Sequence, residues 1–376
     1  MVMAKESKTK TKSDADAKVI TRLKEEAADV LSAIDNETNP KIKIPLRTIS
    51  NVYFDEKAGM IKMGDKQQLR TFFNIGQAKK FLQTFLIAST LKEQLIDTGK
   101  TTSIRDLFYM TKHTIEGTNE NTFEEQEESD PIIEDIEVMI DALREELHLF
   151  ASSRGSMIGN ITIVDGGDTI DCSRLGTGGW SIPSIVEKDI VQFKKCDADF
   201  VLIVEKDAMW RRLNEDKFWK KHNCILLHGQ GVPPRGVRRL LWRFATELKL
   251  PVYVFVDNDP WGFYIYSVIR QGSINLAYES MRMAVPNAKF IGLSSFDCER
   301  YKLPPAATIK LNQEDIRRSH EILKYPWFKK KGWQEEIKEM LRRGVKLELE
   351  ALSKKGISFV SDVYLPEKLK NKQWLE

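Results

Sequence analysis

The sequence predicts a two-domain protein of mixed class. An α+β domain of helices and a β-hairpin precedes an α/β domain built on a mainly parallel sheet. The chain has 376 residues, which suits two domains and a tail better than one ordinary domain. Apolar residues recur at helical spacing from Gln77 to about Phe150. After Ser184, continuous apolar runs alternate with helical segments, which indicates a parallel sheet covered on both faces.

The composition is that of a globular protein. Hydrophobic residues make up 41% of the chain and charged residues 30%. The formal net charge of +3 is too small to indicate a polyanionic partner by itself. The chain starts without an apolar signal segment and contains no run of membrane-spanning length, so we expect a cytoplasmic protein without membrane contact. Four cysteines without a CxxC pair predict reduced thiols rather than a zinc site or disulfides.

The first 70 residues are expected to form a tail and an arm. Residues 1–18 are rich in Lys, Ser and Thr and poor in apolar residues, which is typical of disorder. Within residues 19–70, "KVITRLKEEAADVLSAID" has helical spacing, and "KIKIPLRTISNVYFDEKAGMIKMG" alternates like strands around a turn.

Residues 71–188 are expected to form the first domain. Three helical segments end with "PIIEDIEVMIDALREELHLF", in which Pro131 is expected at the helix start. The segment "GNITIVDGGDTIDCS" predicts a hairpin, because two alternating runs flank Gly166 and Gly167. Three helices and a hairpin predict a winged helix, a helix-turn-helix variant common in DNA-binding proteins. The acidic stretch at 116–130 is interpreted as a solvated loop without an assigned role.

Carboxylates follow two apolar runs of the second domain, residues 189–376. "FVLIV" leads to Glu205 and Asp207, and "VYVFV" leads to Asp257 and Asp259. Ligands gather at the carboxyl ends of strands in open α/β sheets, so these residues are candidates for a Mg²⁺ site. We prefer Glu205 over Asp207, which is expected to cap the next helix. Each acid could instead be only a cap or a turn residue.

A basic helix follows a third strand. In "HGQGVPPRGVRRLLWRF", glycines allow a close backbone approach to phosphate, and Arg235, Arg239 and Arg243 recur on one helix face. This stripe is a candidate DNA contact, although such a stripe is commonly only a solvated face.

Tyr109 lies in the short helical segment "TTSIRDLFYMTKH". Arg105 is four residues before it and Asp106 three, so all three share one helix face. A phenol is protonated near neutral pH, so a nucleophilic tyrosine needs a nearby cation, metal or base. Arg105 could supply positive charge and Asp106 could orient Arg105 or a water. The alternative is an ordinary core or interface aromatic.

Four motifs together resemble the A subunits of type IIB DNA topoisomerases, the DNA topoisomerase VI family, which is related to the transesterase that makes meiotic double-strand breaks. They are "SIRDLFYM", "VEKDA", "GQGVPPRGVRRLLWR" and "VDNDPWG", and the resemblance covers nearly the whole chain after the tail. It implies that residues 71–188 are a CAP-like winged-helix domain and residues 189–376 a Toprim domain.

The resemblance also implies a reaction. Tyr109 would attack a phosphodiester of duplex DNA, leaving a 5′-phosphotyrosyl bond and a free 3′-hydroxyl, with Arg105 and Asp106 in support. Glu205 would be a metal ligand and an acid–base group, and Asp257 and Asp259 would bind Mg²⁺. The family motif often has two adjacent tyrosines, whereas Phe108 precedes Tyr109 here, so only one hydroxyl can attack.

The resemblance further implies an assembly. No G-x-x-x-x-G-K-[ST] loop is present, so ATP hydrolysis is expected on a separate B subunit. The expected A₂B₂ heterotetramer would relax and decatenate DNA in the nucleoid. In its A₂ homodimer, Tyr109 of one protomer would meet the metal site of the other. Residues 19–70 are the candidate B-subunit contact.

Three other functions stay open. The DxD pattern also occurs in phosphohydrolases of the haloacid dehalogenase type, although Trp261 stands where they carry Thr or Val. The chain could also be a non-catalytic DNA-binding module. It could be a Toprim nuclease that uses metal-activated water instead of a tyrosine.

Overall fold

The computed structural model describes residues 14–376. Most of the predicted tail, residues 1–13, lies outside the described residues. Residues 14–18 are not a tail, because they begin helix α1 (Asp14–Asp35). Asp14 and Asp16 in its first turn complement the positive end of the helix dipole. The Asp16 carboxylate also lies 2.9 Å from His148 Nε2, which ties this turn to the domain.

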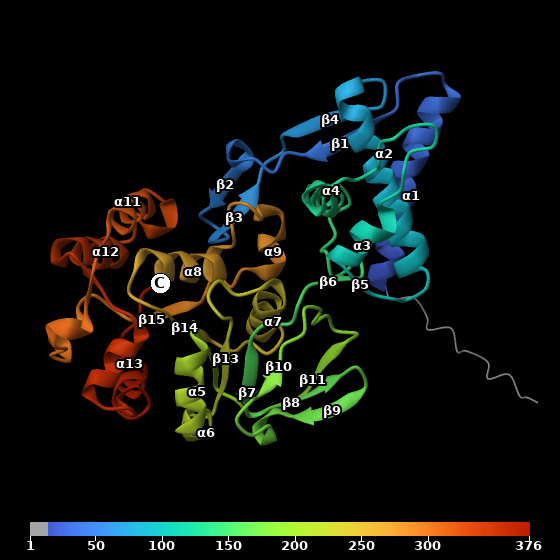
Figure 1. The fold of residues 1–376 in the computed structure, drawn as a ribbon. Helices are drawn as coiled ribbons and strands as arrows, with labels where there is room; N and C mark the ends of the chain where they lie inside the picture. Colours follow the sequence, from blue (N-terminus) through green and yellow to red (C-terminus); the bar gives the residue numbers. More distant parts are fainter. Residues whose placement is uncertain (1–13) are drawn as a thin grey trace, which may run out of the picture. The chain divides into compact units, whose positions relative to one another are not determined.

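The described chain forms two compact units (Figure 1). The N-terminal unit comprises residues 14–51 and Gly64–Ala151, and the C-terminal unit comprises Val52–Met63 and Ser152–Glu376. The boundaries expected after residues 70 and 188 do not coincide with these units.

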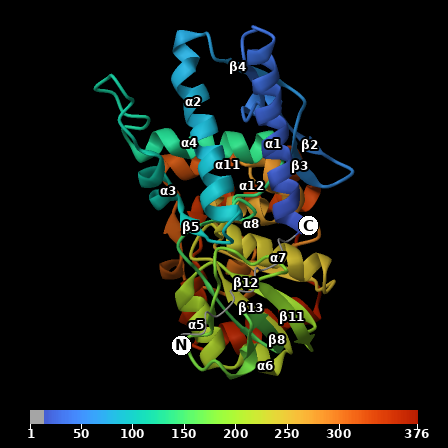
Figure 2. The same ribbon diagram turned by 90° about the vertical axis from the view of Figure 1, so that its right-hand side faces the viewer.

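The N-terminal unit is mainly helical, with α1 and α2 side by side in both views and α4 packed against α2 (Figures 1 and 2). Strand β1 pairs with β4 antiparallel, and β5 pairs with β6 in parallel. Besides α1, the elements are β1 (Lys41–Pro45), η1 (Ile49–Asn51), β4 (Gln67–Thr71), α2 (Ile75–Thr90), the π-helix η2 (Leu91–Ile96), β5 (Thr102–Ser103), α3 (Ile104–Thr111), α4 (Gln126–Met139) and β6 (Leu149–Phe150).

Residues 19–70 are not an independent arm. Val19 and Leu23 of α1 are buried in the main core of the N-terminal unit. Ile42 and Ile44 of β1 pack in a second, smaller core of this unit. The predicted hairpin between residues 52 and 63 does form, but it belongs to the C-terminal unit. Local patterns identified the elements, whereas their tertiary partners are far away in sequence.

Two predictions around residue 130 are wrong. Pro131 lies inside α4 rather than at its start, because the helix begins at Gln126. The acidic stretch at 116–130 is not wholly solvated, since Phe123 is fully buried and α4 begins within it. The same helix ends at Met139 instead of about residue 150, and Asp141 adopts a left-handed conformation just beyond it.

The C-terminal unit contains the mainly parallel sheet that the sequence predicts. Its strand order is β10-β7-β13-β12-β14-β15. The last four strands are parallel, and β7 near one edge pairs antiparallel with both β13 and β10. The strands are β10 (Trp180–Ser181), β7 (Ser156–Gly159), β13 (Cys224–His228), β12 (Phe200–Val204), β14 (Val252–Phe255) and β15 (Lys289–Gly292).

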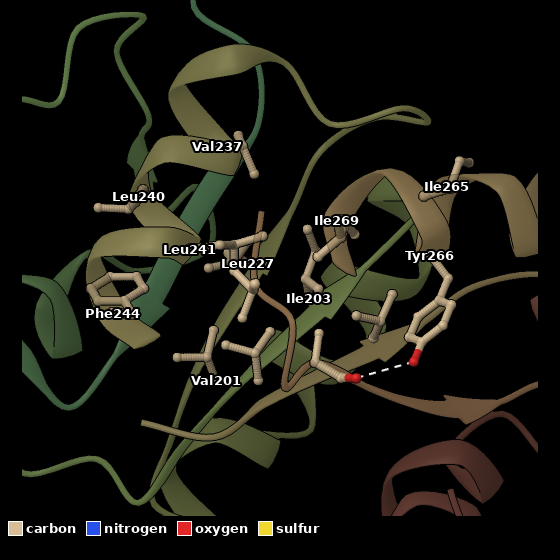
Figure 3. Packing of buried hydrophobic residues seen from close by; sticks show 14 of the residues in the cluster. Val201, Ile203, Leu227, Val237, Leu240, Leu241, Phe244, Ile265, Tyr266 and Ile269 are labelled. Carbon is tan, nitrogen blue, oxygen red and sulfur yellow. Dashed lines mark hydrogen bonds between the residues drawn. The ribbon is translucent and has the colours of Figure 1, made fainter. Parts of the chain in front are cut away.

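Helices cover both faces of this sheet. Alternate strand residues point to opposite faces. Val201 and Ile203 pack against α7 and α8 (Figure 3), whereas Leu202 and Val204 share the opposite core with α5. The helices of this unit are α5 (Asp207–Glu215), α6 (Phe218–Lys221), α7 (Arg235–Thr246), α8 (Pro260–Gln271), α9 (Ser280–Met283), α10 (Asp297–Arg300), α11 (Gln313–Ile322), α12 (Lys331–Arg343) and α13 (Leu365–Lys370). Across residues 14–376, no helix is both long and apolar enough to cross a membrane.

The hairpin predicted as a wing forms, but it does not belong to the unit that holds the three helices. Strands β8 (Ile161–Asp165) and β9 (Asp168–Asp171) join β11 (Val191–Cys196) in a three-stranded sheet of the C-terminal unit. Gly166 and Gly167 both have positive φ, as a tight two-residue turn requires. The remaining short strands of this unit are β2 (Val52–Asp55), β3 (Met60–Met63), β16 (Ile309–Lys310) and β17 (Val345–Lys346).

Candidate functional site

Helix α3 positions Tyr109 through a capped start and a buried face. Ser103 is the N-cap: its Oγ accepts a hydrogen bond from Asp106 N–H at 3.0 Å and lies 2.8 Å from Asp106 Oδ2. Leu107 and Phe108 are buried in the core of the N-terminal unit. These contacts fix which face of the helix points outward.

The outward face carries the three residues that the sequence predicts. Tyr109 is 60% exposed, and Arg105 and Asp106 are also exposed. Tyr109 is therefore not a core aromatic. Its ring makes an edge contact with Phe108, whose ring centre is 5.1 Å away. An exposed hydroxyl beside an exposed guanidinium can reach a large ligand such as a nucleic-acid backbone.

The strand-end carboxylates lie at a topological switch point, where the chain leaves neighbouring strands toward opposite faces of the sheet. Strands β12 and β14 are neighbours, but the chain continues from β12 into α5 on one face and from β14 into α8 on the other. Such a switch point is the usual ligand crevice of an open α/β sheet. Asp257 N–H donates a hydrogen bond to Glu205 Oε2 at 3.0 Å, so the structure brings the ends of both strands together.

Burial raises the pKa values of these carboxyls. Burial and then the charge of Asp257 raise the pKa of Glu205 to about 7. Burial also raises the pKa of Asp257 to about 6, against the lowering effect of Lys206. The pKa of Asp259 is raised, again mainly by burial. Asp257 is buried and the other two acids are half-buried. A cation would be favourable beside such neighbouring acids, because their surroundings disfavour the charged forms.

Two of the acids also have local roles in helices. Asp259 is the N-cap of α8, and its Oδ1 accepts a hydrogen bond from Gly262 N–H at 2.6 Å. Asp207 does not cap α5 as expected. It is the first residue of that helix, and its Oδ2 accepts from Arg211 Nε at 2.7 Å.

Sequence reasoning missed Lys206, the residue after Glu205. Its Nζ lies 2.9 Å from Asp257 Oδ2, 2.8 Å from Glu350 Oε2 and 3.4 Å from Glu348 Oε2. The alternating "LELE" segment was a possible signal for the two glutamates. The "LELE" segment is far from Lys206 along the chain, so no local sequence pattern connects the two glutamates with this lysine.

Sequence reasoning also missed the support beneath the DxD pair. Asn258 points away from its acidic neighbours, and its Nδ2 donates to Glu336 Oε1 at 2.9 Å. Ser294 Oγ donates to Glu336 Oε2 at 2.6 Å, and Ser295 Oγ donates to Asn258 Oδ1 at 3.0 Å. Glu336 and Asn258 are both buried. Helix α12 therefore holds the turn that carries Asp257 and Asp259.

The donor set fits a hard divalent cation in its chemistry. Glu205, Asp257 and Asp259 offer carboxylate oxygens, the ligands that Mg²⁺ prefers. Within residues 14–376, however, no three His, Cys, Asp or Glu side chains already converge as a ligand group. A cation would have to draw these carboxylates together and compete with Lys206.

The arginine stripe is not an open basic face. Arg243 is 1% exposed, donates to the Val191 carbonyl at 2.7 Å and pairs with Glu247. Arg239 makes two 2.7 Å bonds to Glu187. Arg235 pairs with Glu279. The expectation that Arg243 contacts DNA is wrong, because its charge is buried and paired; for Arg235 and Arg239 it stays a prediction.

Three protein families match consecutive parts of the chain. Residues 79–149 match the family "Type IIB DNA topoisomerase", and residues 154–197 match the family of the all-β domain in the DNA topoisomerase VI α chain. Residues 200–369 match the Toprim domain family of topoisomerase 6 A subunits and Spo11. The first match contains Tyr109 and the third contains Glu205, Asp257 and Asp259.

Curated relatives match over nearly the full length. The A subunit of type 2 DNA topoisomerase 6 from Pyrococcus abyssi is 47% identical over 94% of this chain and 94% of its own. The protein of the same name from Sulfurisphaera tokodaii is 40% identical over the whole of both chains. The A3 subunit of DNA topoisomerase 6 from Oryza sativa subsp. indica is 35% identical over 88% of this chain and 73% of its own.

Proposed function

The chain belongs to the A-subunit family of type IIB DNA topoisomerases, and from this membership we propose how its residues cut and rejoin DNA. Tyr109 is the nucleophile. The observation that carries this assignment is the outward face of α3, where Tyr109, Arg105 and Asp106 are exposed together within the matched type IIB segment.

Cleavage is a transesterification. The Tyr109 oxygen bonds to the phosphorus and loses its proton, while the bond from phosphorus to the 3′-oxygen breaks and that oxygen gains a proton. Arg105 stabilises the charge on the phosphate, and Asp106 holds the start of α3 through Ser103. The reverse attack by the 3′-hydroxyl rejoins the strand without a nucleotide, because the phosphotyrosyl bond conserves the energy.

The strand-end carboxylates are the proposed Mg²⁺ site, with Glu205, Asp257 and Asp259 as ligands. A bound divalent ion would stabilise negative charge on the phosphate and the departing oxygen. Without metal, burial raises the pKa of Glu205 to about 7, and a bound divalent ion would favour its ionised form.

Duplex DNA is the proposed substrate of the N-terminal unit. The order α2, β5, α3, α4 and β6, with β5 paired to β6, supports a winged-helix core, although the hairpin predicted as its wing lies elsewhere. We assign DNA binding to the surface around α3. A cytoplasmic, nucleoid-associated location follows from this substrate.

The proposed enzyme is an A₂B₂ heterotetramer, with a second copy of this chain and two ATPase B subunits, which relaxes and decatenates DNA.

We propose that the B subunit contacts residues 19–70 together with the start of α2. Large apolar side chains are exposed there: Leu31, Ile34, Leu69, Phe73 and Ile75. The end of α1 and the start of α2 lie at the same end of this unit in both views (Figures 1 and 2). Loss of B-subunit pull-down by Phe73→Ser with Ile75→Ser, at unchanged thermal stability, would support this surface; unchanged pull-down would contradict it.

Covalent trapping tests the nucleophile. End-labelled duplex DNA is incubated with Mg²⁺, ATP and the B subunit, then quenched with detergent. The wild-type chain is expected to carry label through the 5′ end, and Tyr109→Phe to carry none. The matched control is Tyr53→Phe, because Tyr53 is also exposed (52%) but lies outside α3. Cleavage that survives Tyr109→Phe with protein-free ends would favour the metal-dependent nuclease instead.

A further inference from the structure

Lys206 joins one strand-end carboxylate, that of Asp257, to two glutamates from a distant segment. It follows Glu205 directly, so it leaves the sheet at the same switch point. Its ammonium contacts Asp257 on one side and Glu348 and Glu350 on the other, at 2.9, 3.4 and 2.8 Å. Its side chain is 26% exposed, whereas those of the two glutamates are about half exposed.

Both oxygens of Asp257 are engaged in this arrangement. Oδ1 accepts a hydrogen bond from Leu349 N–H at 2.8 Å, and Oδ2 faces Lys206 Nζ. A Mg²⁺ ligand must approach to about 2.1 Å, closer than an ammonium does. An ion on Oδ2 and the Lys206 ammonium at 2.9 Å from the same oxygen would repel each other strongly. Asp257 can therefore bind the ion through Oδ2 only if Lys206 moves away.

The glutamates beyond Lys206 offer it an alternative position. Glu350 already contacts Nζ at 2.8 Å, and Glu348 lies within 3.4 Å. A flexible four-carbon side chain can turn from Asp257 toward these two carboxylates without leaving its charge unpaired. Leu349, whose N–H bonds to Asp257, stands between the two glutamates in the chain, so this segment contacts both the ligand and its competitor.

We propose that Lys206 is a built-in counter-cation that the divalent metal displaces. In the absence of metal, its ammonium compensates the charge of Asp257. When metal binds, Lys206 shifts to Glu348 and Glu350, so that the divalent ion replaces the ammonium at Asp257. Lys206 thereby sets the metal concentration at which the site fills. This inference rests on the metal site of the proposed function.

Metal affinity measured on the DNA-free chain tests the exchange without any enzyme turnover. Binding of Mn²⁺ as a probe is followed by the loss of the free-ion signal in electron paramagnetic resonance. Lys206→Met keeps the aliphatic stem and removes the charge, so it is expected to tighten binding by about fivefold, the scale of one exposed ion pair. Lys206→Gln, a polar neutral variant, should act in the same direction.

The two glutamates are expected to act through Lys206, and a double-mutant cycle isolates this effect. Glu348→Gln with Glu350→Gln should weaken Mn²⁺ binding in the wild-type background, because Lys206 loses its alternative position. The same pair should have little effect in the Lys206→Met background. An equal loss in both backgrounds would mean that the glutamates attract the ion directly, and it would overturn the exchange.

The control for net charge is Lys221→Met. Lys221 lies in the same unit and pairs with Asp362 at 3.2 Å, so its loss removes one positive charge without touching Asp257. Unchanged or weaker Mn²⁺ binding in both Lys206 variants, or an equal gain of Mn²⁺ affinity in Lys221→Met, would overturn the role of Lys206. Neither result would count against the metal site itself. If Glu205→Gln and Asp257→Asn bind Mn²⁺ as well as the wild type does, the metal site itself fails, and the role of Lys206 fails with it.

Discussion

Glu205 and Asp257 meet at the carboxyl edge of the sheet, where burial already disfavours their charged forms. The main-chain N–H of Asp257 compensates Glu205 in part, and Lys206 compensates Asp257. The remaining cost shows in the raised pKa values of both carboxyls. Because ionisation of these carboxyls is unfavourable here, a divalent cation that neutralises several of them at once should bind favourably.

The pH dependence of metal stabilisation follows from Glu205. Its pKa in the folded chain is about 7, above the ordinary value of 4.5. Without metal, the folded state therefore loses stability as pH rises from about 4.5 through 7, where Glu205 ionises against its surroundings. Metal needs the ionised form, so added Mg²⁺ should raise the melting temperature more at about pH 8 than at about pH 5.5. Thermal unfolding followed by circular dichroism measures this difference. Asp257, whose pKa is raised to about 6, should leave a smaller difference in Glu205→Gln. An equal shift at both pH values in the wild type, or an undiminished difference in Glu205→Gln, would contradict the role of Glu205.

The charged side chain of Arg243 stabilises the folded state through buried contacts. Its guanidinium bonds two carbonyls and Glu247 and lies over the Phe193 ring, 4.4 Å from its centre. Arg243→Ala should lower the free energy of unfolding by about 3–5 kcal/mol, because it leaves buried partners unpaired. Denaturant unfolding measures this loss. Arg211→Ala, which removes an exposed partner of Asp207, should cost about 0.5 kcal/mol or less. Similar losses for the two variants would contradict the structural role.

At the scale of elements, helix α12 fixes the turn between β14 and α8. Asn258 bonds its main chain to Leu347 in both directions and its side chain to Glu336 and Leu293. The turn is thus held from three segments that are far apart in sequence. Asp257 and Asp259 flank Asn258, so their spacing depends on this buried contact rather than on the metal alone.

Glu336 is expected to act on metal binding through Asn258. Glu336→Ala removes the acceptor of Asn258 Nδ2 and of Ser294 Oγ, so Mn²⁺ affinity should fall several-fold and stability by about 1–3 kcal/mol. Glu336→Gln keeps an acceptor toward Asn258 and should restore most of the affinity. Titration of each variant with Mn²⁺ gives the comparison. Glu339→Ala on the same helix removes pairs with Arg342 and Arg343 and serves as the control. If the affinity of Glu336→Ala equals that of the wild type, α12 does not position the ligands.

The sequence was informative where the signal is local. Apolar runs located the parallel strands, and the residues after them gave Glu205, Asp257 and Asp259. Helical spacing placed Arg105, Asp106 and Tyr109 on one face. Prediction from the sequence failed where tertiary contacts determine the structure. The hairpin at 161–171 joins β11, and residues 52–63 belong to the C-terminal unit. Two arginines of α7 pair with acids that are far away in sequence. Lys206 and Glu336 were missed for the same reason, because their partners are not neighbours in sequence.

At the scale of the whole molecule, the proposed catalytic residues are divided between two compact units. Tyr109 lies in the N-terminal unit, and the carboxylates lie in the C-terminal unit. The proposed A₂ dimer combines the tyrosine of one protomer with the carboxylates of the other. This division predicts that neither unit alone would cleave DNA.

Mixed dimers test this arrangement. A Tyr109→Phe protomer is paired with a Glu205→Gln protomer, using two affinity tags to isolate the mixed species with the B subunit. If the site forms across the dimer, one of its two sites has both wild-type groups, and the mixed enzyme should nick one strand. The homodimer of each variant should be inactive. If tyrosine and carboxylates of the same protomer act together, the mixed dimer has no intact site, and an absence of nicking would refute the crossed arrangement.

Identification of the residue that carries DNA tests the central claim most directly. The trapped complex is digested with nuclease and protease, and the peptide with a remaining nucleotide is sequenced by tandem mass spectrometry. We expect a single adduct, on Tyr109, joined through the 5′-phosphate of the nucleotide. An adduct on another residue, or cleaved DNA without any adduct, would contradict the assignment of Tyr109 as the nucleophile.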